Sequence, residues 1–117
     1  MDFKKQKPIY MQIADTLCER ILADEWETDN RIPSIREVAA SLGVNPNTAM
    51  RAFDFLQNEE IIYPQRGEGY YLSGKAKKNI LKLHRKEFLQ EEAPYLLNRM
   101  KILGITWDEL QELTNKN

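Results

Sequence analysis

The chain has 117 residues, of which 42% are apolar and 30% charged, with a formal net charge of −1 and one cysteine. This length fits one domain, or a small domain with an appendage, and the composition excludes a disordered chain. The sequence has no apolar run of about 18 residues and no apolar N-terminal stretch, so we expect neither a membrane span nor a signal peptide. A single cysteine excludes an internal disulfide and a thiolate metal site. We therefore expect a cytoplasmic protein with no metal and no cofactor.

The charge is unevenly distributed along the chain. Residues 1–74 hold 8 basic and 12 acidic side chains, a net charge of −4, whereas residues 75–117 hold 9 and 6, a net charge of +3. The total charge therefore does not indicate a nucleic-acid binder. Any contact with DNA has to depend on where the few cations lie.

Apolar residues near the N-terminus follow steps of three and one, which predicts an amphipathic helix over about residues 8–24. These residues are Tyr10, Ile13, Ala14, Leu17, Cys18, Ile21 and Leu22. Pro8 suits the first turn, where its missing N–H is not needed. The polar stretch DEWETDNRIP predicts a connector, and Cys18 is interpreted as a small core residue.

Two short helices follow this connector. Ser34 and Glu37 form the S-x-x-E pattern of a capping box, and Gly43 ends the helix that they begin after about eight residues. Asn45 is placed to cap a third helix over about residues 46–58, whose first residue is a proline.

The stretch IIYPQRGEGYYL predicts a β-hairpin. Two apolar, aromatic-rich runs flank the segment from Pro64 to Gly69, and Gly67 is available for a turn in a loop of about four residues. Helix, tight turn, helix and hairpin together indicate a mainly α, winged helix-turn-helix domain over residues 1–74.

Small polar side chains, Asn45, Asn47 and Thr48, are the first to project from the third helix. An α-helix fits the major groove of DNA, and its N-terminal side chains reach base edges and phosphates. Each of these residues alone is also common in a cap or a solvated first turn, which is the alternative interpretation. The combination of two capped helices, a glycine turn and a hairpin favours DNA binding.

Residues 75–117 are predicted to form a helical tail. Apolar residues recur in it every seven positions, in two adjacent series: Leu81, Phe88, Tyr95 and Ile102, then Leu89, Leu96 and Leu103. Pro94 interrupts the pattern, so we expect the helix either to kink there or to stop and restart. Gly104 ends this segment, and Thr106 with Glu109 predicts a capped last helix.

The apolar stripe of the tail is too narrow to be hidden against so small a domain. We expect its seven residues to form a two-fold dimer, because pairing with a second copy would bury them. Such a dimer would bind two half-sites of a palindromic operator in double-stranded DNA. The alternative is that the tail folds back on the first helix of its own chain.

Three stretches of the sequence, PIYMQI, IPSIREVAASLGVNPNTAMRAF and RGEGYYL, resemble the N-terminal domain of GntR-type bacterial transcriptional regulators. The resemblance covers residues 8–74, and the VNPNT form with a short tail is similar to the YtrA subfamily. It implies a sequence-specific DNA-binding regulator, with repression as the simplest mode. It also implies target genes beside a transporter of the ABC type.

The resemblance also implies DNA-contact roles for six residues: Arg36, Asn45, Asn47, Thr48, Arg66 and Gly67. Arg36 begins the second helix, and Arg66 with Gly67 forms the wing tip, which in the family enters the minor groove. Because Arg51 lies near the groove-facing side of the third helix, we expect it to contact a phosphate.

The chain departs from the family pattern at a few positions. Many family members carry arginines where this chain has Pro46 and Met50, and a glycine near Glu59–Glu60. Two lysine clusters could add phosphate contacts or face water: Lys4, Lys5 and Lys7, then Lys75, Lys77, Lys78 and Lys82.

Other functions find less support in the sequence. His84 is the only histidine, on a helix rich in Lys and Arg, and no catalytic cluster accompanies it, so we expect no enzyme. The effector domains of larger family members do not fit in residues 75–117, although a small molecule between two tails stays open. The main alternative is a winged helix used for protein–protein contact, which the net charge of −4 on residues 1–74 favours.

Overall fold

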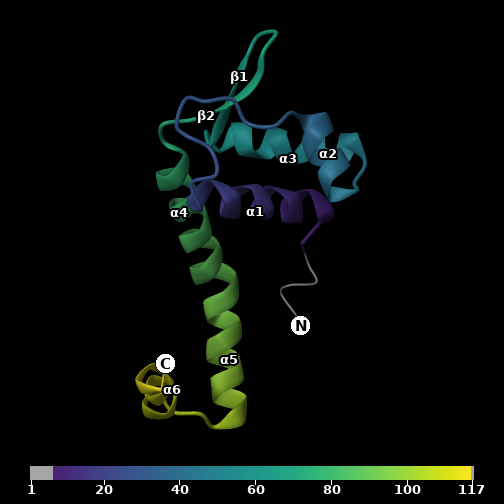
Figure 1. Cartoon of the computed structure of the whole chain (residues 1–117). Helices are drawn as coiled ribbons and strands as arrows, with labels where there is room; N and C mark the ends of the chain where they lie inside the picture. Colours follow the sequence, from purple (N-terminus) through teal and green to yellow (C-terminus); the bar gives the residue numbers. More distant parts are fainter. Residues whose placement is uncertain (1–6, 117) are drawn as a thin grey trace.

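Three helices, a hairpin and a long helical tail follow one another along residues 7–116, the part of the chain that the computed structural model describes (Figure 1). The elements are α1 (Ile9–Leu22), α2 (Ile35–Leu42), α3 (Pro46–Asn58), β1 (Ile62–Gln65), β2 (Gly69–Leu72), α4 (Ala76–Glu87), the π-helical turn η2 (Phe88–Glu92), α5 (Ala93–Leu103) and α6 (Trp107–Asn115). This architecture confirms the predicted winged helix-turn-helix with a small β-hairpin and a helical tail.

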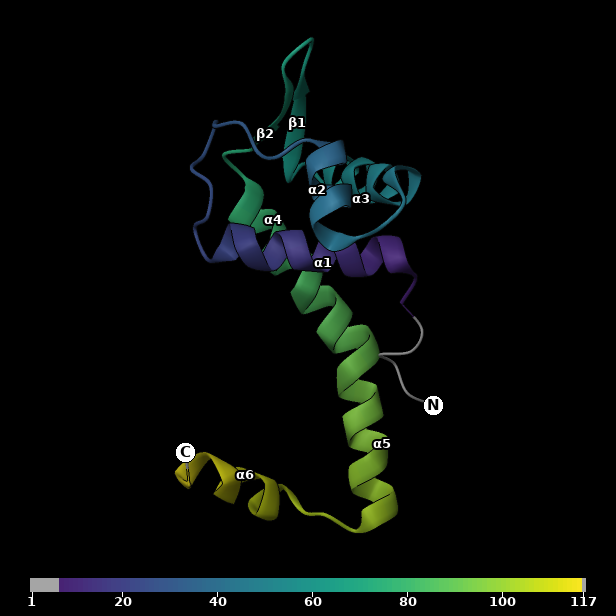
Figure 2. The ribbon, with the colours of Figure 1, turned by 45° about the vertical axis from the view of Figure 1, so that its right-hand side comes forward.

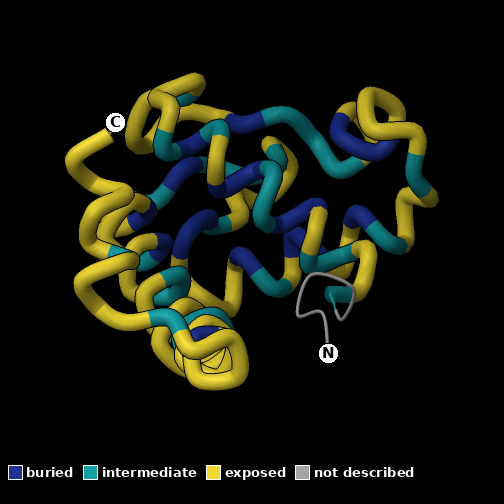
Figure 3. Tube along the Cα trace, turned by 90° about the horizontal axis from the view of Figure 1, so that it is seen from below, coloured by how far each residue is buried: buried dark blue, intermediate teal, exposed yellow. Residues whose placement is uncertain are grey.

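The hydrophobic core lies where α1 packs on α3, and α2, the hairpin and the start of α4 close it. Leu17 and Cys18 of α1, Phe53 of α3, Ile62 of β1 and Ile80 of α4 are all buried. Burial raises the pKa of the Cys18 thiol to about 12, in agreement with its predicted place in the core. We call α1, α2, α3 and the hairpin the body. Figure 3 shows the buried segments gathered there, while the tail, seen almost end-on, is mostly exposed.

Local hydrogen bonds set the boundaries of α2 and α3, which match the prediction. Ser34 Oγ accepts from the N–H of Glu37, and Glu37 Oε1 accepts from the N–H of Ser34, both at 3.1 Å, so the capping box is confirmed. Gly43 has a φ of 66°, and its N–H and that of Val44 donate back to carbonyls of α2. A side chain disfavours this left-handed conformation, so glycine makes the tight turn. Asn45 then caps α3 directly.

Helix α1 ends at Leu22, slightly earlier than the predicted limit near residue 24. Asp24 has a φ of 61°, and the N–H of Glu25 donates to the carbonyl of Arg20 at 3.1 Å. This closing turn directs the chain away from the helix axis and into the connector.

The hairpin pairs its strands antiparallel, from Ile62 opposite Leu72 to Gln65 opposite Gly69. Its turn consists of residues 66–68, with Gly67 at a φ of 76°, so it is one residue shorter than predicted. We use the term wing for residues 62–72.

The turn between α3 and the wing contains a left-handed residue that is not glycine. Glu60 has a φ of 57°, at a place where the family resemblance leads one to expect glycine. The N–H of Ile61 closes the turn by donating to the carbonyl of Leu56 at 2.9 Å. The side-chain amide of Asn79, on α4, donates to the carbonyls of Glu59 and Glu60 at 3.1 and 3.2 Å. The tail helix therefore helps to hold the end of α3.

The tail runs as a continuous helical rod from α4 to α5 (Figure 2). Of the two expectations at Pro94, the stop and restart is wrong, because Ala93 keeps helical angles, with φ −65° and ψ −45°, and a π-helical turn lies just before the proline. Pro94 has no N–H to donate, and the wider turn absorbs the change in hydrogen-bond register. Heptad positions before and after this turn are thereby rotated about the helix axis relative to each other.

The tail ends in a second capping box. Gly104, with a φ of 68°, terminates α5, and Thr106 and Glu109 exchange hydrogen bonds at the start of α6 as predicted. Among residues 7–116, no helix is both long and apolar enough to cross a bilayer.

Candidate nucleic-acid interface

The exposed side of α3 and the wing form one surface, and the tail leaves from the opposite side of the body. Ala49, Ala52 and Phe53 of α3 are buried in the core, whereas Asn47 and Arg51 are exposed. Both views of the ribbon show the wing and the tail projecting in opposite directions (Figures 1 and 2). The surface that carries the N-terminus of α3 is therefore not covered by the tail of the same chain.

The tip of α3 keeps hydrogen-bonding groups available for a ligand. Asn45 Oδ1 accepts from the backbone N–H of Asn47 at 2.8 Å. The cap uses only the amide oxygen, so the Asn45 side chain can still donate through its NH2 group. Asn47 is exposed and Thr48 is half-buried beside it. The dipole of the helix N-terminus favours an anion at the same place.

The predicted cations lie on three different elements, α2, α3 and the wing. Arg36 is exposed in the first turn of α2, and Arg66 and Gly67 are exposed in the turn of the wing. The turn of the wing therefore presents a guanidinium beside a residue without a side chain, which lets the backbone approach a surface closely. This arrangement suits a groove lined with phosphates.

Arg51 makes a contact that sequence periodicity does not reveal. Its guanidinium carbon lies 4.3 Å from the centre of the Tyr10 ring, a cation–π arrangement between α3 and the first turn of α1. Tyr10 belongs to the PIYMQI stretch. The ring restricts the arginine without neutralising its charge, so Arg51 is held on the exposed side of α3.

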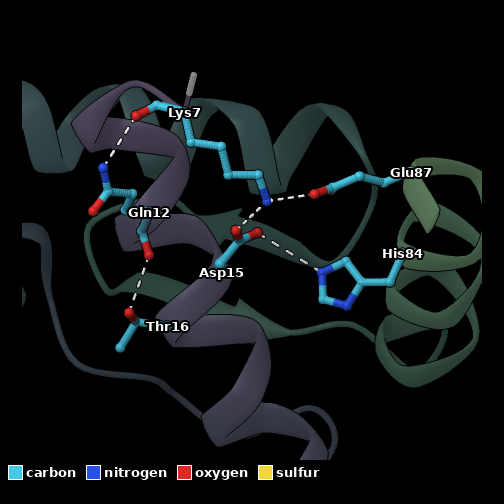
Figure 4. A network of polar contacts seen from close by, with 6 residues as sticks. All are labelled: Lys7, Gln12, Asp15, Thr16, His84 and Glu87. Atoms are coloured by element: carbon cyan, nitrogen blue, oxygen red, sulfur yellow. Dashed lines mark hydrogen bonds and ion pairs between the residues drawn. The ribbon is translucent and has the colours of Figure 1, made fainter. Parts of the chain in front are cut away.

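Lys7, from the first of the two lysine clusters, makes contacts within its own chain, and Lys4 and Lys5 lie outside the described residues. It forms ion pairs with Asp15 of α1 and, at 2.6 Å, with Glu87 of α4 (Figure 4). Burial alone would lower the pKa of Lys7, but its hydrogen bonds to the two carboxylates outweigh this effect and raise it. Lys7 therefore joins α1 to α4 and does not face DNA.

His84 lies at the edge of the same ionic cluster. Its Nε2 is 3.8 Å from Asp15 Oδ1, beyond hydrogen-bond distance, and the side chain is about one-third exposed (Figure 4). This position between α1 and α4 fits the predicted surface or interface residue. The body is connected to the tail by four residues that we call the clasp: Lys7, Asp15, His84 and Glu87.

Comparison with known proteins identifies the family. The model of the "Bacterial regulatory proteins, gntR family" matches residues 9–72, from the start of α1 to the end of the wing. The chain belongs to the GntR family. It is therefore a transcriptional regulator with a DNA-binding winged helix, as the resemblance predicted.

Two relatives of this GntR protein match it through the tail as well. It is 34% identical to the uncharacterized regulator YhcF of Bacillus subtilis, over 94% of this chain and 89% of the relative. It is 30% identical to the transcriptional repressor YtrA of the same organism, over 96% and 85% of the two chains. A crystal structure of a GntR-family regulator from Bacteroides thetaiotaomicron superposes with a TM-score of 0.79 at 40% identity, covering 92% of this chain and 94% of that one.

Proposed function

We propose that this GntR-family regulator is a cytoplasmic, dimeric repressor that binds a palindromic operator near an operon for an ABC-type transporter. The main support is that the tail exposes an apolar surface on the side away from the exposed α3 tip and the wing. Pairing through the tails would leave both DNA-binding surfaces free. The repressor function named for the relative YtrA supports repression as the mode of action.

The proposed DNA contacts follow from the chemistry of each element. Asn47 and Thr48 at the tip of α3 would read base edges in the major groove, and Asn45 would donate to a base or a phosphate. Arg66 and Gly67 would enter the minor groove, whose negative potential attracts a guanidinium. Arg36 and Arg51 would bind phosphates on either side.

The proposed dimer surface consists of seven side chains that are all exposed in the single chain: Leu81, Phe88, Leu89, Tyr95, Leu96, Ile102 and Leu103. Ile102 alone is 65% exposed. A monomer rarely leaves so many large apolar side chains in water, and an interface is the usual reason. A shallow hollow of about 320 Å³, lined by Leu81, His84, Arg85, Phe88 and Leu89, could receive a side chain of a second tail.

The alternative of a tail folded back on its own body accounts only for α4, whose contacts with the body end at Glu87 of the clasp. Ala76 and Ile80 are buried against the body, whereas the residues from Leu81 onward include the exposed set. The clasp fixes α4 on α1, so the direction of the tail relative to α3 is set within one chain. Two such chains joined by their tails would hold two recognition helices at a defined spacing, as a two-fold operator requires.

Selection from a pool of random duplex DNA tests this function. We expect enrichment of a short two-fold sequence, and sedimentation at micromolar concentration should show a dimer. The double variant Arg36→Ala/Asn47→Ala should lose binding while keeping its helical circular dichroism. Asn115→Ala/Lys116→Ala removes one amide and one positive charge at the exposed end of α6, and this control should bind as the unchanged protein does.

Two results would contradict the proposal. If no sequence is enriched at low salt, the winged helix serves protein–protein contact instead. If the protein sediments as a strict monomer with and without DNA, the tail does not dimerise. Transcription from a promoter carrying the selected sequence, measured with and without the protein, would distinguish a repressor from an activator.

A further inference from the structure

Gly69, at the start of β2, lies beside the side chain of an arginine from another segment, Arg31. A Cβ atom built on Gly69 would lie 3.4 Å from Nε of Arg31 and 3.8 Å from its Nη2. These are ordinary van der Waals distances, so the guanidinium of Arg31 packs against the wing at Gly69. The φ of 102° at Gly69 favours glycine by itself, and the contact with Arg31 is a second property of the same position.

The backbone around Arg31 is fixed to the wing as a short third strand. The N–H of Ile32 donates to the carbonyl of Tyr70, and the N–H of Leu72 donates to the carbonyl of Asn30, both at 3.0 Å. Arg31 itself forms an isolated antiparallel bridge with Tyr71. Both the backbone and the guanidinium of Arg31 are thus held before any ligand arrives, although the residue is exposed.

The charge of Arg31 lies between the wing and α2. Backbone and side-chain hydrogen bonds from Ser34 lower the pKa of Glu37, and the positive charge of Arg31 lowers it further. Arg31 is therefore close enough to the first turn of α2 to act on Glu37. Within residues 7–116, however, no carboxylate lies within 4.0 Å of its guanidinium. An exposed arginine held rigidly without an ion-pair partner is preorganised for an anion from outside the chain.

We infer that Arg31 binds a DNA backbone phosphate between the wing and α2, and that Gly69 is the positioning residue that seats its guanidinium. This inference rests on the proposed DNA binding. A phosphate is the appropriate ligand because Arg31 lies beside β2, from Tyr71 to Gly69, and not in the turn of the wing that carries Arg66. The planar guanidinium can donate two parallel hydrogen bonds to phosphate oxygens. The contact would link those proposed for Arg66 and Arg36 along one strand of the duplex.

The first experiment measures DNA affinity of the full chain as a function of salt, with the selected operator and with an unrelated duplex. We expect Arg31→Ala to weaken binding to both duplexes by about tenfold, the typical effect of losing a charged hydrogen bond. Removing one phosphate contact should also reduce the slope of log affinity against log salt by about 1. Arg31→Lys should keep the slope but lose part of the affinity. Lys116→Ala is the charge-matched control and should change neither quantity.

A double-mutant cycle tests the role of Gly69. Gly69→Ala adds a methyl group 3.4 Å from Nε of Arg31, and it also strains the backbone, because Gly69 has a φ of 102°. The strain is the same whether position 31 holds arginine or alanine, so it cancels in the coupling energy of the cycle. We expect Gly69→Ala to weaken binding several-fold when Arg31 is present and to add almost nothing to Arg31→Ala.

Each outcome decides one point. An unchanged affinity and salt slope for Arg31→Ala, together with lost binding for Arg36→Ala/Asn47→Ala, would overturn the inference and leave the proposed function intact. Additive effects in the cycle would show that Gly69 does not position Arg31. If the unchanged protein itself fails to enrich any DNA, the proposed function fails first.

Discussion

Large apolar side chains are mostly buried in the body and mostly exposed in the tail. Phe53 of α3 is 0% exposed and lies in the core, whereas Phe88 at the start of η2 is 48% exposed. The body buries its apolar residues within one chain, and it needs no partner for a core. The tail carries as regular an apolar pattern, but among its described residues from Leu81 onward only Met100 is buried. The same composition therefore supports folding in one region and, in our proposal, association in the other.

The largest effect should come from truncating the two phenylalanines separately. Phe53→Ala should lower the free energy of unfolding by about 3–5 kcal/mol, because it leaves a cavity in a fully packed core. Phe88→Ala should lower it far less at low protein concentration and should mainly weaken the concentration dependence of the melting temperature. Thermal unfolding at several concentrations measures both. Equal losses that do not depend on concentration would show that Phe88 is packed within its own chain.

A charge on the tail sharpens the comparison by separating folding from association. Leu89→Asp should give a monomer with intact helical circular dichroism and reduce operator affinity by about a hundredfold, because the second half-site no longer adds to the first. Gln90→Asp adds the same charge at the neighbouring exposed position and is the matched control. Light scattering and fluorescence anisotropy measure the two quantities. A Leu89→Asp protein that stays dimeric would remove Leu89 from the proposed interface.

Substitutions at left-handed residues of the body should change the free energy of unfolding by a smaller amount. Glu60 occupies a left-handed conformation, so Glu60→Gly should stabilise the protein by about 1 kcal/mol. Gly43→Ala should destabilise by a similar amount, because Gly43 has a φ of 66° and nothing lies within 4 Å of an added Cβ. Urea unfolding compares the two. A loss of stability in Glu60→Gly would mean that the Glu60 side chain makes a favourable interaction that outweighs the strain.

The smallest effect concerns the capping box of α2. Hydrogen bonds from Ser34 hold the pKa of Glu37 below its ordinary value of 4.5. A carboxylate with a lowered pKa contributes stability above its ordinary pKa, and this contribution disappears as the pH falls through the folded-state value. Glu37→Gln should therefore flatten the dependence of unfolding free energy on pH below about 4.5. Unchanged pH dependence would show that the box does not distinguish the two protonation states.

Much of the fold could be predicted because its signals are local. The box of Ser34 and Glu37, the glycine turn at Gly43 and the cap at Asn45 each depend on atoms within a few residues. Helix boundaries in the body follow from such contacts, and they agree with the sequence. The predicted end of the tail, with its capping box at Thr106, agrees for the same reason.

The continuous tail could not be predicted from the same signals. Pro94 predicted either a kink or a stop and restart, and the sequence did not decide between them, whereas the π-helical turn before Pro94 lets the helix continue. Whether a helix uses such a turn depends on the balance between lost hydrogen bonds and the rest of the packing. The heptad pattern therefore identified the exposed apolar residues but not their exact alignment around the helix axis.

By itself, the sequence determined the order and type of the elements, the family, and the residues at the tip of α3 and of the wing, because these depend on short-range patterns. Only the tertiary structure brought Arg31 onto Gly69, Arg51 onto Tyr10, and Lys7 between Asp15 and Glu87. These pairs come from distant segments whose side chains meet only after the core has packed. Position in space, and not residue type, decides which of the arginines is held ready for a phosphate and which lysine is used to join the body to the tail.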